Sequence, residues 1–99
     1  IAINQNFEFG ILDCIGILHI FNRNGKKRKS INTVIDEPKF LIPLRNDWLV
    51  FNKKGIGISI NNQNSVIIPN SSTPIIDIVH LNRSLAVLSS DHILIMDVK

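Results

Sequence analysis

The fold class is indicated most directly by residues 55–61, which read Gly55-Ile56-Gly57-Ile58-Ser59-Ile60-Asn61. Isoleucine alternates there with small residues, so one face of the segment is apolar, as in a strand buried on one side. Two other segments have a similar character, Gly16-Ile17-Leu18-His19-Ile20-Phe21-Asn22 and His92-Ile93-Leu94-Ile95-Met96-Asp97. The three segments begin 39 and 37 residues apart, which indicates a repeated structural unit.

The composition of the whole chain also favours strands. The 99 residues include 19 Ile and 12 Asn but only two Ala and two Glu. Side chains branched at Cβ suit a pleated strand, and the good helix formers are scarce. We therefore predict one all-β domain over residues 1–99, built as a meander of antiparallel hairpins. Strands are expected at residues 7–13, 16–22, 28–35, 39–44, 47–52, 55–61, 65–69, 75–81, 84–89 and 92–98.

Two proline-containing connectors divide this meander. They are Asp36-Glu37-Pro38 and Asn70-Ser71-Ser72-Thr73-Pro74, and they leave segments 1–36, 37–73 and 74–99. Each segment contains one of the three similar strands, and a shorter apolar strand precedes it. The middle segment supplies four expected strands. A four-stranded meander that repeats about every 40 residues is typical of a propeller blade.

With these features the chain resembles the WD-repeat and WD-like β-propeller families. The stretch from Ile75 to Val98 carries the resemblance, because Met96-Asp97 stands where those families often have an aromatic or apolar residue followed by Asp. Phe21-Asn22 occupies the same place in the first segment. The chain departs from the family pattern in having no Gly-His pair that opens a repeat and no Trp-Asp pair that closes one.

The resemblance implies about three blades of a larger ring, since a propeller has four to eight blades. Further chain or a partner would complete that ring, and the first residue, Ile1, also suggests a processed or excised piece. A small β-sandwich or barrel with coincidental spacing remains the alternative fold.

No combination of residues indicates catalysis. His19, His80 and His92 lie on different expected strands without the spacing of metal ligands. The single cysteine, Cys14, rules out an internal disulfide framework or a thiolate zinc site, and it fits a reducing compartment. The chain has no nucleophile elbow and no phosphate-binding glycine loop. We expect no enzyme activity, no metal and no cofactor, and no run of about 20 apolar residues that could span a membrane.

The most prominent charged segment is residues 23–29, Arg23-Asn24-Gly25-Lys26-Lys27-Arg28-Lys29. It carries five cations, and the rest of the chain has six basic and eight acidic residues. Such a hairpin tip could bind phosphates or an acidic partner. Residues 26–29 also resemble a nuclear-import signal. No aromatic residue is interleaved with these charges, which argues against stacking on bases.

These observations predict a non-enzymatic scaffold for protein–protein interaction, part of a WD-like propeller in an intracellular complex, cytoplasmic or nuclear. The alternative is binding of nucleic acid or of an acidic partner through the basic hairpin. The candidate binding residues are Arg23, Lys26, Lys27, Arg28, Lys29 and Arg45. Trp48, the only indole, lies among Leu49, Val50 and Phe51 and is expected in the core.

Overall fold

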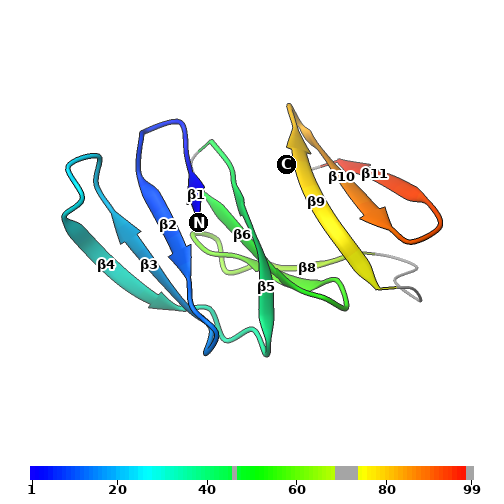
Figure 1. Ribbon diagram of the computed structural model, residues 1–99, viewed down its shortest axis with the longest axis horizontal. Helices are drawn as coiled ribbons and strands as arrows, with labels where there is room; N and C mark the ends of the chain where they lie inside the picture. Colours follow the sequence, from blue (N-terminus) through cyan, green and yellow to red (C-terminus); the bar gives the residue numbers. More distant parts are fainter. Residues whose placement is uncertain (46, 69–73, 98–99) are drawn as a thin grey trace.

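A computed structural model describes residues 1–45, 47–68 and 74–97 (Figure 1). These residues form three antiparallel sheets and no helix. Sheet A contains β1 (Ala2–Ile3), β2 (Phe9–Leu12), β3 (Ile17–Phe21) and β4 (Lys27–Asn32). Sheet B contains β5 (Pro38–Pro43), β6 (Trp48–Asn52), β7 (Ile56–Ser59) and β8 (Ser65–Ile67). Sheet C contains β9 (Ile75–Leu81), β10 (Ser84–Ser89) and β11 (Ile93–Asp97).

Within each sheet every strand pairs with the next strand along the chain, and the sheets stand side by side in chain order (Figure 1). The all-β prediction is therefore confirmed, and each of the ten expected strands overlaps an observed strand. Strand β1 was not expected. In the described part of the chain the three sheets form an open row and not a closed ring. The connector predicted at residues 70–73 lies outside the described residues.

One hydrogen-bonding pattern shapes four of the turns. In each case an Asn or Asp side-chain oxygen accepts hydrogen bonds from the backbone N–H groups two and four residues later, at 2.9–3.1 Å. The residue three positions after that Asn or Asp has a positive φ, which glycine adopts most easily. The four turns begin at Asn4, Asp13, Asn22 and Asn52. In sheet A these turns recur every nine residues, so each strand and its turn form one short unit.

Sheets A and B repeat a second contact around their positive-φ glycines. The carbonyl of Gly16 accepts a hydrogen bond from Thr33 N at 2.9 Å, and the carbonyl of Gly55 accepts one from Ile68 N at 2.9 Å. Both bonds join the turn between the second and third strands to the residue that follows the fourth strand. A side chain would not fit well at Gly55, because its Cβ would lie 3.0 Å from Cβ of Ile68. The two glycines are 39 residues apart, as are the similar strands in the sequence.

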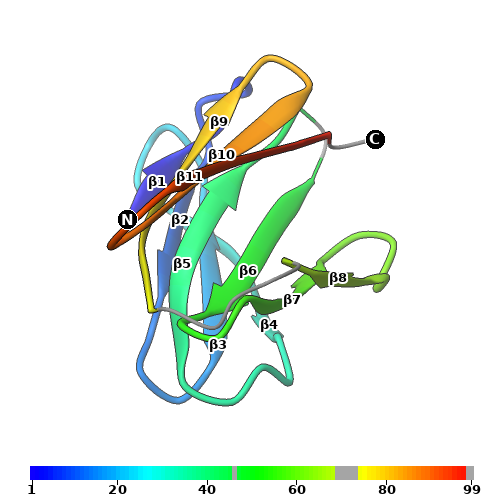
Figure 2. The same ribbon diagram turned by 90° about the vertical axis from the view of Figure 1, so that its right-hand side faces the viewer.

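The centre of sheet B, at β6, is buried on both faces, because the sheet lies between the other two sheets (Figures 1 and 2). All five residues of β6 are buried. Trp48 and Val50 pack with Leu18 and Ile20 of sheet A. On the opposite face of β6, Leu49 and Phe51 pack in a second cluster with residues of sheet C. The rest of that cluster is Ile42, Ile68, Ile75, Ile78, Leu85 and Val87.

The joint between sheets A and B depends on the absence of a side chain at Gly10. The six-membered ring of Trp48 lies against this glycine, since a Cβ added there would be 2.8 Å from Cζ3 of the indole. Trp48 is only 4% exposed, which agrees with its predicted place in the core. Packing between the facing surfaces of neighbouring sheets therefore holds the three sheets together.

Candidate binding site at one end of the sheets

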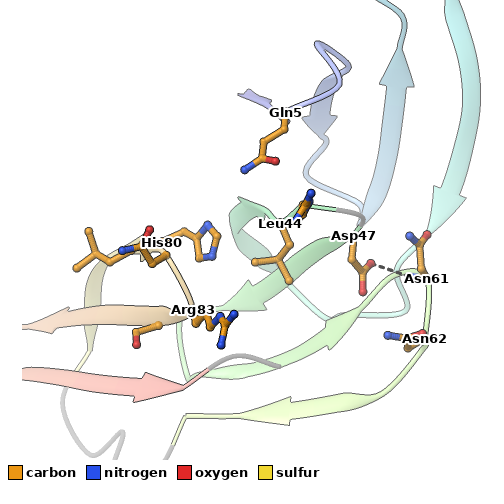
Figure 3. Close-up of a pocket in the computed structure, with 11 residues that line it drawn as sticks. Gln5, Leu44, Asp47, Asn61, Asn62, His80 and Arg83 are labelled. Carbon is orange, nitrogen blue, oxygen red and sulfur yellow. Dashed lines mark hydrogen bonds between the residues drawn. The ribbon is translucent and has the colours of Figure 1, made fainter.

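Alternate turns of the meander meet at one end of the molecule. Because each strand runs antiparallel to its neighbour, the turns β1–β2, β5–β6 and β9–β10 lie at the same end, together with β3–β4 and β7–β8. An open hollow of about 1140 Å³ lies at this end, and residues from all three sheets line it (Figure 3). The lining residues are Gln5, Leu44, Arg45, Asp47, Asn61, Asn62, His80, Leu81, Asn82, Arg83 and Ser84. We call this hollow the large hollow.

Asp47 fixes the wall of the large hollow that sheet B contributes. Its Oδ1 atom accepts hydrogen bonds from Trp48 N at 2.7 Å and from Asn61 N at 2.8 Å. The second bond, drawn in Figure 3, joins the β5–β6 turn to the residues after β7. The carbonyl of Asp47 also accepts a hydrogen bond from Leu44 N at 2.8 Å. This carboxylate is therefore used to hold the turn in place.

The large hollow also contains cationic side chains with no partner in the described residues. Arg45 comes from the β5–β6 turn and Arg83 from the β9–β10 turn, and both are exposed. Neither guanidinium has a hydrogen bond or an ion pair with any described residue. His80, half-buried at the end of β9, lies on the same side of the hollow as Arg83, while Asp47 lies on the opposite side (Figure 3). Guanidinium groups left free in this way can bind carboxylates in the two-pronged geometry that arginine favours.

A smaller hollow of about 150 Å³ adjoins the large one between sheets A and B. Asp47 and Asn61 line both hollows, and the smaller one is also lined by Arg28 and Lys29. Arg28 forms an ion pair there with Glu8. Cations from all three sheets thus line a continuous surface, which we call the cationic track. It consists of the two hollows with Arg28, Lys29, Arg45 and Arg83.

In the predicted basic hairpin, some cations contact other side chains and others are exposed to solvent. Arg23 lies over the ring of Phe7, with its guanidinium carbon 5.6 Å from the ring centroid, and Arg28 pairs with Glu8. Lys26 and Lys27 are exposed. Most of these charges lie on or beside β4, the edge strand of sheet A, where cations discourage pairing with a strand of another molecule.

The six predicted binding residues do not form one cluster. Five belong to the β3–β4 hairpin and its edge strand, whereas Arg45 belongs to the β5–β6 turn. Only Arg28 and Lys29 come near Arg45, through the adjoining hollows. Neither Arg83 nor His80 was predicted from the sequence as a binding residue. The sequence feature that could have indicated Arg83 is the polar pair Asn82-Arg83 between two apolar segments, which predicts an exposed turn. In the structure Asn82 has a positive φ of 54° in that turn.

A second polar cluster lies on sheet A away from the hollows. His19 Nε2 is 2.8 Å from Oδ2 of Asp13, and His19 Nδ1 is 3.1 Å from Oγ of Ser30. The pKa of Asp13 is lowered, first by the hydrogen bond from Ile17 N and then by the one from His19. These contacts join the β2–β3 turn to the edge strand β4, so we assign them a structural role. Among the described residues, no group of His, Cys, Asp and Glu side chains could hold a metal ion.

Comparisons of the chain with protein-family models, with curated proteins and with solved structures found no match. The resemblance to WD-like propellers therefore remains a prediction from the sequence. The described residues also contain no helix of the length and apolar character needed to cross a membrane.

Proposed function

We propose that the three sheets are consecutive blades of a WD-like β-propeller, and that this propeller is a scaffold for protein–protein interaction in an intracellular complex. The row of four-, four- and three-stranded meanders supports the proposal, as does the packing of each sheet on the face of the next. The first strands of neighbouring sheets also lie together, since β5 contacts both β1 and β9. In a propeller the first strands of all blades surround the central axis.

The scaffold would bind an acidic segment of a partner protein along the cationic track. The single observation that carries this proposal is the convergence of Arg28, Lys29, Arg45 and Arg83, from three separate sheets, on two adjoining hollows. Gln5 and Asn62 add amide groups that can hydrogen-bond a peptide backbone. An extended chain with several carboxylates fits such an open, polar surface better than a small apolar ligand does.

Binding of nucleic acid through the basic hairpin has weaker support. Two of its five cations, Arg23 and Arg28, already contact Phe7 and Glu8. Among the described residues no Phe or Trp lines the large hollow, and its one imidazole, His80, is half-buried, so that surface offers bases little to stack on. The lysines Lys26 and Lys27 stay exposed and could still attract phosphates. Nucleic acid is therefore the competing outcome of the experiment.

The test measures fluorescence anisotropy of two labelled probes, a peptide of alternating Glu and Ser and a single-stranded DNA oligomer. The double variant Arg45→Ser/Arg83→Ser removes two cations from the track. Surface charge pairs are worth about 0.5–1 kcal/mol each, so we expect peptide affinity to fall about 5- to 30-fold. The matched control is Lys39→Ser/Lys53→Ser, which removes two cations of sheet B at the opposite end of the strands.

Equal losses in the two double variants would mean that only net charge attracts the peptide, which contradicts the proposed site. Tighter binding of the DNA than of the peptide, abolished by Lys26→Ser/Lys27→Ser, would favour the basic hairpin instead.

A further inference from the structure

The outer face of sheet C is an apolar surface that none of the described residues covers. The side chains of Leu85 and Val87 point toward sheet B, so the alternate residues of the sheet point away from it. Six large apolar side chains on that outer face are 40–64% exposed, and Ala86 lies among them. The six are Ile76, Val79, Leu81, Leu88, Ile93 and Ile95. Together they present on the order of 500 Å² of apolar surface, near the upper limit for monomeric proteins.

The outer face of sheet A, at the other end of the row, is also left open by the part of the chain that the structure describes. Leu18 and Ile20 of β3 pack toward sheet B, so Ile17, His19 and Phe21 point away from it. In β2, Ile11 pairs with His19 and is exposed on the same face. Each chain therefore has two exposed end faces, one at each end of its row of sheets.

We infer that the outer face of sheet C docks on the outer face of sheet A of a second copy of this chain. Two copies related by a twofold axis would make this joint twice and close one ring of six sheets, within the four to eight blades of known propellers. The two joints together bury on the order of 2000 Å², which is enough for a stable dimer. The inference rests on the propeller arrangement proposed above.

The contact between sheets A and B within the chain serves as the template for the proposed contact between two copies. There the third strand of sheet A, with Leu18 and Ile20, packs with the second strand of sheet B, with Trp48 and Val50. The same arrangement between copies places Ile95, on the third strand of sheet C, against Ile11, on the second strand of sheet A.

Charge agrees with this arrangement. Asp97 pairs in register with Ser84, so it lies at the end of sheet C that carries the large hollow. Lys27 pairs in register with Phe21, so it lies on the outer face of sheet A at the corresponding end, next to the β3–β4 turn. Sheet A carries the cluster of five cations, whereas the described part of sheet C has one arginine against three aspartates. Face-to-face docking would therefore bring opposite charges together.

Light scattering coupled to size exclusion gives the first test. We expect the unmodified chain to have twice the mass of one copy, and Ile95→Lys or Ile11→Lys to raise the dimer dissociation constant at least tenfold. Both residues are exposed within one copy, so the fold of each variant should survive. The control is Ile67→Lys, which changes an isoleucine that is 67% exposed on β8, away from both end faces.

Disulfide trapping identifies which faces meet. In a Cys14→Ser background, chains with Ile95→Cys are mixed with chains with Ile11→Cys and then oxidised. We expect crosslinks between the two kinds of chain. Crosslinking of Ile95→Cys chains mainly to one another would overturn the inference, and so would a monomeric mass or a long open polymer for the unmodified chain. A monomer that still binds the acidic peptide through Arg45 and Arg83 would refute the second copy and leave the proposed function intact.

Discussion

Replacing Gly10 by alanine places a methyl group in the joint between sheets A and B. The added Cβ would lie 2.8 Å from Cζ3 and 2.9 Å from Cη2 of Trp48, whereas carbon atoms in contact prefer about 3.5–4.0 Å. The indole must therefore move by roughly 1 Å within a buried cluster. Overpacking of this kind costs about 1–3 kcal/mol, so we expect the free energy of unfolding to fall by about 2 kcal/mol. For a domain of this size that lowers Tm by about 8–16 °C.

A double-mutant cycle isolates this contact from other effects. Trp48→Phe removes the outer ring atoms that the new methyl group would meet. In that background Gly10→Ala should cost little, because the next nearest atom, Cδ2 of Leu41 at 3.2 Å, is the end of a flexible side chain, and alanine loses less backbone entropy than glycine. We therefore expect a coupling energy of about 2 kcal/mol from urea unfolding followed by far-ultraviolet circular dichroism. Tryptophan fluorescence cannot follow unfolding in the Trp48→Phe proteins, because Trp48 is the only tryptophan. Circular dichroism is therefore used for all four proteins. Additive effects of the two substitutions would refute the close packing of sheet A on sheet B at this point.

Three other expectations concern the turns. Asn52→Ala removes two hydrogen bonds made by a buried side chain and should cost about 1–3 kcal/mol in urea unfolding, whereas Asn52→Asp keeps the acceptor and should cost less. Gly55→Ala should lower Tm more than Gly25→Ala, because both positions need a positive φ but only Gly55 has a close neighbour; equal losses would contradict this. The lowered pKa of Asp13 stabilises the fold above the ordinary carboxyl pKa, and this contribution is lost as pH falls through the lowered value. Thermal melts between pH 7 and 2 should therefore show a smaller acid-induced fall in Tm for Asp13→Asn than for the unmodified chain. The same fall in both proteins would contradict this role of Asp13.

Much of the secondary structure follows from local sequence, because alternation and turn chemistry act over a few residues. The isoleucines at 56, 58 and 60 and the Asn-Gly turn at residues 24–25 placed their strands and turns correctly. Strand β1 was missed because it has only two residues, too few for any alternation. The nine-residue spacing of Asn4, Asp13 and Asn22 was visible in the sequence, but its meaning depends on the turn hydrogen bonds.

The candidate site was less predictable, because it depends on packing between sheets. Arg45 and Arg83 are far apart in sequence, and the packing of sheet B on sheet C brings both of them to one hollow. In β6 every residue is buried, so no alternation could indicate which side chains meet sheet A and which meet sheet C. The basic hairpin was conspicuous in the sequence, yet the sequence could not show that Glu8 and Phe7 would engage two of its cations.

Sheet B lies between two sheets of similar build, as a blade does in a propeller, and both the candidate site and the proposed function depend on this arrangement. Nuclear Overhauser effects between side chains measure this directly. We expect the methyl groups of Val50 to show contacts with Leu18 and Ile20 of sheet A, and the ring of the adjacent Phe51 to show contacts with side chains of sheet C. Contacts of both residues with the same sheet, or a solvent-exposed Phe51, would contradict the stacked arrangement and favour a two-layered sandwich or a barrel.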